Sequence, residues 1–191
     1  MAINFFEKMN AKTRVEELFF APLYKVEVFE ADDFSSIAEI LCSETSFRLY
    51  CVDCRHDSVF TIVPDDSLVN SMLTGSFGIK PKVADVVVLK CGMEKFHEVR
   101  FMFVCRKVIR SFDGEDFEYH VVKVGQYPGL ADFYLPQISK YRKMLGNHYG
   151  EFSKAIGLMA HGVGIGSFVY LRRIIEKLVG EAHGKAVLAA G

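Results

Sequence analysis

The chain has almost no excess charge of either sign, because its 23 lysines and arginines are balanced by 24 aspartates and glutamates. Domains that bind nucleic acids or anionic membranes over a wide surface are usually strongly basic. The near balance excludes a global electrostatic footprint of that kind, so any nucleic-acid binding would have to be local. No internal repeat is visible either, and the sequence does not predict a repeat architecture.

The first residues lack the basic segment and the long apolar run of a secretory signal. We therefore expect a cytoplasmic protein whose five cysteines are reduced. Cysteine is absent from the last 86 residues, and the odd number between positions 42 and 105 does not suit a disulfide framework. This distribution favours thiol or metal chemistry within one module.

Apolar residues are plentiful: they make up half of the chain, which is enough for a hydrophobic core. Periodicity divides the chain into an α/β region at 1–124 and a helical domain at 125–191. The predicted elements are helices at 3–20, 34–42, 130–145 and 152–179, and strands at 23–30, 47–50, 59–63, 86–90, 99–108 and 117–124. The expected fold class is α+β, with an antiparallel zinc-ribbon-like β module followed by an α-helical domain.

Two segments do not fit these elements. The stretch from Pro64 to Pro81 is polar and contains glycine, which predicts an insertion or a loop. The last eight residues form no convincing closing element, which is consistent with a chain truncated at its C-terminus.

The strongest motif is a pair of cysteines separated by two residues, Cys51 and Cys54. Two thiols at this spacing can face one point from a tight turn, as tetrahedral zinc requires. The remaining ligands must come from the other cysteines and histidines, and the candidates are Cys42, His56, Cys91, His97 and Cys105.

Geometry narrows this list. On an extended strand His97 and Cys105 would lie about 26 Å apart, at about 3.3 Å per residue, so one ion cannot bind both. A turn at Gly92 brings Cys91 close to His97. The predicted ligands are therefore Cys51, Cys54, Cys91 and His97, and four protein ligands make the zinc structural. In the alternative interpretation the cysteines are small buried hydrophobic residues.

A glycine-rich segment, 162–167, precedes a predicted helix with Ser167 as its N-cap. Backbone N–H groups there could bind phosphate, with Gly164, Gly166, Ser167 and Arg172 as the candidate residues. No strand comes directly before the segment, and the dinucleotide-binding and Walker spacings are absent. We favour a packing role, because Gly157, Ala160 and Gly164 recur at helical spacing and would let another helix approach, either in a buried helix pair or in a homo-oligomer.

A membrane span is not predicted. Residues 155–171 carry no formal charge, but they include four glycines and His161, which suit hydrocarbon poorly.

A basic strip lies on one predicted strand beside Phe101 and Phe103, and consists of Arg100, Arg106, Lys107 and Arg110. Such a strip suits contacts with a nucleic acid, yet it also suits a solvated strand face whose opposite face is buried. We favour the solvated face.

Three segments, 123–129, 155–158 and 166–173 with Glu176, resemble a family of uncharacterised bacterial proteins, over about residues 50–180. The resemblance implies a zinc-ribbon-like β module and a helical domain distantly similar to HEPN domains. Some HEPN domains are ribonucleases with an arginine followed four to six residues later by a histidine, and Arg142 and His148 match this spacing. Gly146 and Asn147 should however end the helix between them.

The sequence thus favours a zinc-binding protein that acts as a non-enzymatic binding or regulatory module with an unidentified macromolecular partner. The alternatives are a metal-independent ribonuclease that uses Arg142 and His148, and a nucleotide or phosphate sensor built on residues 162–167.

Overall fold

The computed structural model describes residues 5–65, 85–94, 96–112 and 114–190. The chain forms two compact units, Met1–Pro128 and Gly129–Gly191, each of which is described by itself. Most of the predicted loop at 64–81 lies outside the described residues.

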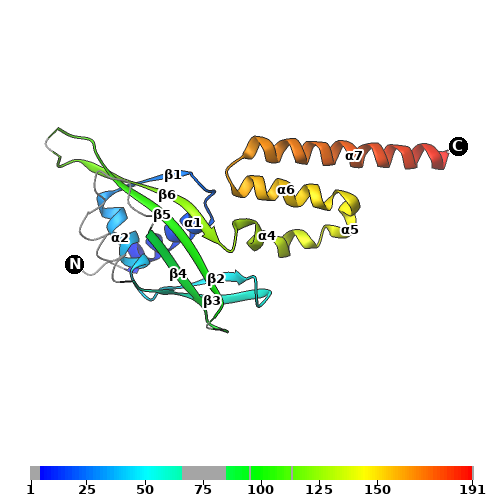
Figure 1. The fold of residues 1–191 in the computed structure, drawn as a ribbon. Coiled ribbons are helices and arrows are strands. Elements are labelled where there is room, and N and C mark those ends of the chain that lie inside the picture. The colour runs from blue at the N-terminus through cyan, green and yellow to red at the C-terminus, as the bar shows by residue number, and fades with distance from the viewer. Residues whose placement is uncertain (1–4, 66–84, 95, 113, 191) are drawn as a thin grey trace. The chain divides into compact units, whose positions relative to one another are not determined.

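Unit 1 is a curled six-stranded antiparallel sheet with helices on one face (Figure 1). The strand order is β1-β6-β5-β4-β3-β2, so consecutive strands from β2 to β6 are neighbours, and β1 pairs with β6 at one edge. The elements are α1 (Phe5–Phe20), β1 (Val26–Glu30), α2 (Ala31–Leu41), β2 (Ser46–Cys51), β3 (His56–Val63), β4 (Asp85–Cys91), β5 (Glu98–Ile109) and β6 (Phe117–Tyr127).

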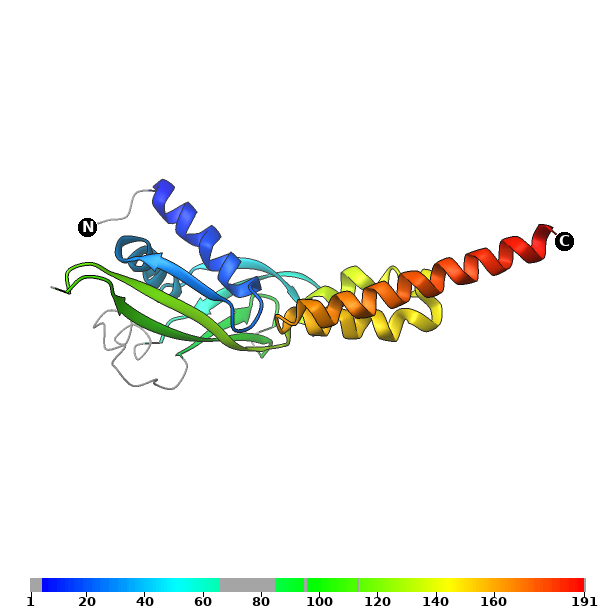
Figure 2. The ribbon, with the colours of Figure 1, turned by 90° about the horizontal axis from the view of Figure 1, so that it is seen from above.

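The core of unit 1 lies between α1 and the sheet. Strand alternation determines which side chains of the sheet enter it. Side chains on a strand point to opposite faces in turn, and on β5 the buried residues alternate from Val99 through Phe101 and Phe103 to Cys105. The helix α1 covers this face (Figure 2), where Phe19 stacks on Phe101 with ring centroids 4.2 Å apart. Burying one such aromatic side chain contributes about 1.5–3 kcal/mol to folding.

One charged side chain lies inside this core. Lys123 on β6 is only 1% exposed, and its Nζ donates hydrogen bonds to the Phe19 carbonyl oxygen and to Gln126 Oε1, at 2.7 and 2.8 Å. Burial lowers the pKa of Lys123 to about 8 because an ammonium group loses hydration in apolar surroundings.

Unit 2 consists of helices, and its elements are α4 (Leu130–Ser139), α5 (Arg142–Leu145), the 3₁₀ turn η1 (Gly146–His148), α6 (Tyr149–Ala160) and α7 (Gly164–Ala190). The two predicted helices are each divided. The helix predicted at 130–145 breaks at residues 140–141, and Gly146, at φ +51°, ends α5. The helix predicted at 152–179 breaks at the turn between α6 and α7, which contains Gly162 at φ +75°. Both are conformations that glycine adopts without a steric penalty. Residues 184–190, which the sequence left without an element, belong to α7.

The mixed α and β character and the antiparallel sheet confirm the coarse fold prediction. The sequence did not predict that β1 would join the same sheet through β6, which makes the β region one continuous six-stranded layer. Among the described residues, no helix is both long and apolar enough to cross a membrane.

Candidate metal centre

Two hairpin turns meet at one end of the sheet of unit 1. The β2–β3 turn follows Cys51, and the β4–β5 loop runs from Cys91 to His97. Because β3 pairs with both β2 and β4, these two turns are brought side by side. Strand alternation puts Cys51 and Cys91 on the face that carries the core, and both thiols are buried.

The four predicted ligands lie together: one donor atom from each of Cys51, Cys54, Cys91 and His97 falls within 4.8 Å of the others. Cys54 Sγ is 3.2 Å from His97 Nδ1 and 4.0 Å from Cys91 Sγ, and Cys51 Sγ is 3.7 Å from the same nitrogen. In a tetrahedral zinc site with bonds of about 2.3 Å to sulfur and 2.0 Å to nitrogen, the ligand atoms are about 3.5–3.8 Å apart. The observed separations bracket these values.

The β2–β3 turn aims two of the thiols at one point. The backbone N–H of Cys54 donates to Cys51 Sγ at 3.4 Å, and the N–H of Arg55 donates to the Cys51 carbonyl oxygen at 2.8 Å. Arg55 adopts a left-handed conformation, with φ at +59°, which is rare outside glycine. The turn therefore places a residue in a strained conformation directly after the second cysteine.

The β4–β5 loop presents the other two ligands. The N–H of Cys91 donates to the His97 carbonyl oxygen at 2.9 Å, which closes the loop. Gly92 is needed for close approach, since a Cβ there would lie 3.1 Å from the Val59 carbonyl oxygen. Glycine is therefore needed here because a side chain would crowd the Val59 carbonyl oxygen. The backbone of Gly92 is not left-handed.

Hydrogen bonds prepare one thiol for ionisation. Burial alone would raise the pKa of Cys91, but bonds from the backbone of Glu94 and Met93 and from the Ser58 side chain lower it to about 7. The pKa of Cys54 is raised to about 12, first by burial and then by its hydrogen bonds to Cys51 and Cys91. Cys91 therefore ionises more readily than Cys54, and a bound cation would favour ionisation of Cys54 by supplying compensating charge.

The other candidate ligands lie elsewhere. Cys105 is buried in the core, where desolvation, followed by the charge of Asp85, raises its pKa to about 12. Cys42 follows the C-terminus of α2. The His56 ring lies beside Ser58, with His56 Nδ1 3.2 Å from Ser58 Oγ. The structure thus brings together the four ligands that spacing favoured and leaves out these three.

Sequence reasoning missed the residues that support the ligands. Ser58 is buried on β3 between the two cysteine-bearing strands and bonds to Cys91. Its position on the core face, two residues before Phe60, was readable from alternation, but a lone serine in a strand gives no signal of its own.

The candidate phosphate residues are in the first turns of α7. The helix begins at Gly164, so the prediction that Ser167 is the N-cap is wrong. Its backbone N–H already donates to the Val163 carbonyl oxygen at 3.1 Å, and its side chain is buried. Close packing occurs at Gly166, where a Cβ would lie 3.3 Å from Leu158, while Gly157 and Gly164 have open space around them. The Arg172 guanidinium pairs with Glu176.

The residues of the ribonuclease alternative make separate contacts. Arg142 begins α5 and lies over the Tyr149 ring at 5.3 Å, whereas His148 Nε2 is 2.9 Å from Glu181 Oε1 on α7. Gly146 ends the helix between them, as the sequence predicted.

The basic strip is a solvated strand face. Its aromatic neighbours Phe101 and Phe103 point into the core and offer no stacking surface. Arg100 pairs with Glu98, and Arg110 pairs with Glu30 and Glu118.

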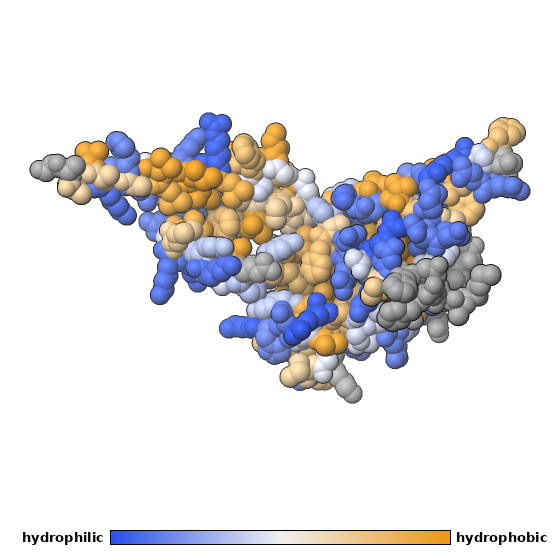
Figure 3. Space-filling view, turned by 180° about the vertical axis from the view of Figure 1, so that it is seen from behind, coloured by the Kyte–Doolittle hydropathy of each residue, from blue (hydrophilic) through white to orange (hydrophobic). Residues whose placement is uncertain are grey.

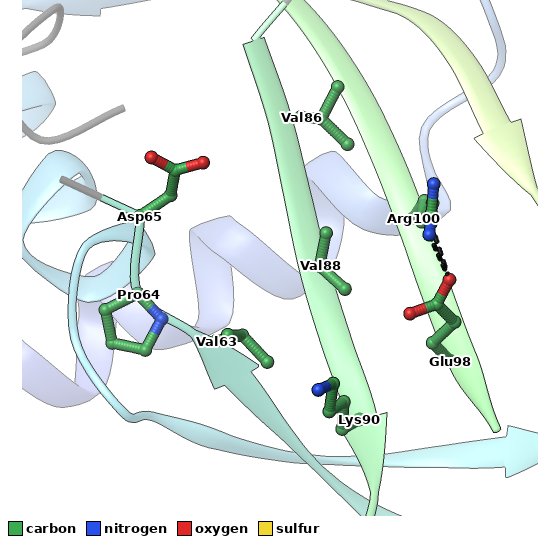
Figure 4. A pocket seen from close by; sticks show the side chains of 8 residues that line it. All are labelled: Val63, Pro64, Asp65, Val86, Val88, Lys90, Glu98 and Arg100. Carbon is green, nitrogen blue, oxygen red and sulfur yellow. Dashed lines mark hydrogen bonds and ion pairs between the residues drawn. The ribbon is translucent and has the colours of Figure 1, made fainter. Parts of the chain in front are cut away.

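A hollow of about 490 Å³ lies on the sheet face that is opposite the core (Figure 4). Val86 and Val88 line it, together with Lys90 and the paired Glu98 and Arg100. Within the hollow the positive charge of Arg100 is balanced by Glu98.

Comparison with known proteins adds no further constraint, since no family model, curated protein or solved structure matches the chain. The assignment of function therefore depends on the geometry of the cluster.

Proposed function

We propose that this protein is a zinc-binding module in which Cys51, Cys54, Cys91 and His97 hold one structural zinc ion, and that it acts by binding a macromolecule. The observation that supports the proposal is the convergence of three sulfurs and one imidazole nitrogen within 4.8 Å. Three thiolates and one imidazole favour zinc over magnesium or calcium, which prefer oxygen ligands.

The donor set also favours a structural role. Catalytic zinc sites keep a coordination position for water, whereas four protein ligands fill a tetrahedron. Each ligand pair spans one hairpin turn, and the two hairpins are adjacent through β3 and β4. Two adjacent turns that share one ion constitute the zinc-ribbon-like feature of the proposal, here at one end of a larger sheet.

A binding role is supported by what the ligand loop exposes. Met93 and Phe96 lie between Cys91 and His97, and the Phe96 side chain is 90% exposed. A metal bound at both ends of this loop would hold the two apolar side chains in place, which lowers the entropy lost when a partner binds. Large exposed aromatic residues are common anchors in protein interfaces.

Elemental analysis of protein purified without chelator tests the metal directly. We expect about one zinc per chain, and Cys54→Ser and His97→Ala should each lose most of it. Cys42→Ser is the matched control, because Cys42 is a free thiol outside the cluster. Metal-free wild-type protein, or equal zinc in Cys54→Ser and Cys42→Ser, would contradict the proposal.

Cobalt substitution tests the ligand set. Tetrahedral Co²⁺ bound to thiolates gives intense visible absorption and a sulfur-to-metal charge-transfer band, both of which should weaken in Cys54→Ser. A spectrum typical of six-coordinate Co²⁺ would show that the four residues do not form a closed site.

A further inference from the structure

The helix α7 is much longer than the helix that packs against it. It has 27 residues, whereas α6 has 12, so at 1.5 Å per residue their lengths are about 40 and 18 Å. Figure 2 shows α7 continuing past the end of α6. From Val179 to Ala189 every residue of α7 is exposed.

An isolated helical segment with this sequence should be unstable. Helices in water gain most of their stability from packing, and segments shorter than about 12–15 residues are marginal. Gly180 and Gly184 lie in this part of α7, and neither is close to any other side chain. Each glycine costs about 1 kcal/mol relative to alanine in a helix. Apart from the contact between Glu181 and His148, the second half of α7 has little packing within its own unit, and a partner helix would stabilise it.

An apolar stripe on α7 identifies the face that would be covered. It consists of Ile165, Phe168, Val169, Ile175 and Val179, each at least 59% exposed. At 100° per residue these five side chains fall within an arc of about 120°. The buried residues Ser167 and Ile174 lie on the other side of the helix. Hydrophobic surface is visible along the helices of unit 2 in Figure 3.

The charges within this stripe are self-complementary. Arg172 and Glu176 lie inside the arc, with Arg172 Nε 2.7 Å from Glu176 Oε1. In a parallel pair of α7 helices the two copies of Arg172 would meet at the same level. In an antiparallel pair with a two-fold axis near residue 174, Arg172 lies level with the partner's Glu176, and Val169 with the partner's Val179.

Side-chain size favours the same direction. The first half of the stripe carries the large residue Phe168, which in the antiparallel register with its axis near residue 174 lies level with the partner's Gly180. This arrangement sets a large side chain of one helix against a position without a side chain on the other. We propose that α7 pairs antiparallel with α7 of a second copy of this chain through the Ile165–Val179 stripe.

Sedimentation velocity of the full-length, zinc-loaded protein tests this interface. We expect a species of twice the 21.6 kDa chain mass at micromolar concentration. Phe168→Glu should weaken the dimer at least about 30-fold, the effect of losing one interface hot spot. Leu188→Glu is the control, because Leu188 is equally accessible but lies about 160° from the centre of the stripe.

Helix content and bound zinc are measured for each variant, so that loss of the dimer is distinguished from loss of fold and from failure of the metal site. A wild-type monomer at 100 µM or equal dissociation by Phe168→Glu and Leu188→Glu would overturn the proposal. Binding to phosphatidylserine vesicles by a protein that remains monomeric would also overturn it, because the stripe would then be a membrane-surface helix.

The direction of pairing is tested by charge exchange and by photo-crosslinking. Arg172→Glu should weaken the dimer, and the double variant R172E/E176R should restore it. A benzoylphenylalanine at Val169 should crosslink to the partner near residues 176–182. Crosslinks confined to residues 165–172 would show parallel pairing and overturn the antiparallel arrangement.

Discussion

The two units of this protein bury their apolar residues to very different extents. Of the buried hydrophobic residues among those described, the helical unit contributes seven, and the sheet unit contributes the rest. The seven are Leu130, Phe133, Ile138, Leu145, Ala155, Ala160 and Ile174. A helical unit of 63 residues is near the size at which one core barely stabilises a fold. The sheet unit is therefore expected to fold on its internal contacts and the proposed metal, whereas the proposed pairing of α7 would supply burial that the helical unit lacks.

Removal of the metal is expected to have the largest effect on the difference in stability between the two units. Chelation, or Cys54→Ser, should destabilise the sheet unit by at least about 5 kcal/mol, because metal binding energy is folding energy at a structural site. Hydrogen exchange should then accelerate in β2, β3 and β4 but remain unchanged in α6. Equal acceleration in both units would show that the two do not fold separately.

Truncation of the central aromatic residue of the sheet unit should have the next largest effect. Phe19→Ala removes the ring that stacks on Phe101 and should cost about 3–5 kcal/mol, measured by urea unfolding. Phe112→Ala is the matched control, since Phe112 is fully exposed in the β5–β6 turn, and its effect should stay within about 0.5 kcal/mol. Similar losses in the two variants would contradict the core assignment.

The buried amine of Lys123 should make the free energy of unfolding of the sheet unit increase at alkaline pH. The pKa of Lys123 is about 8 in the folded protein and about 10.4 when unfolded. Between these values the unfolded chain binds more protons, so stability rises with pH. Relative to Lys123→Met, the wild-type free energy of unfolding should gain about 2 kcal/mol from pH 7 to pH 10. Parallel pH profiles for the two proteins would show that Lys123 is solvated.

Relief of backbone strain beside the metal centre should have the smallest effect. Arg55 has φ at +59°, and Arg55→Gly should raise stability by about 1 kcal/mol or less. Arg48→Gly, on the exposed side of β2, should lower stability by about the same amount. Thermal unfolding of zinc-loaded protein measures both. A destabilising Arg55→Gly would indicate that the arginine side chain contributes more than its backbone costs.

Local pattern was sufficient to predict much of the sheet unit. Runs of β-branched and aromatic residues located β2 to β6, and the Cys51–Cys54 spacing together with the compact loop from Cys91 to His97 selected the four clustered residues. The pairing of β1 with β6 was not predictable, because it joins residues about 90 positions apart and no local signal encodes it. The hydrogen bond from Ser58 to Cys91 was not predictable either, because it depends on the pairing of β3 with β4.

In the helical unit the apolar periodicity was right, and the predicted end at residue 145 matches α5. Periodicity also runs across residues 140–141 and Gly162, where only the backbone shows that the helices break. The placement of Ser167 inside α7, and not at its cap, has the same origin. A capping residue is recognisable only when the first helical residue is known, and glycines blur that position.

The alternation that places Cys51 and Cys91 on one face of the sheet has a consequence for folding fidelity. A slip of β4 by one residue would turn Cys91 away and present Lys90 or Gly92 in its place. Such a chain would retain most of its backbone hydrogen bonds but could not complete the four-residue cluster. An ion bound at the proposed site would therefore favour the correct strand register, because only a correctly aligned sheet would gain its binding energy.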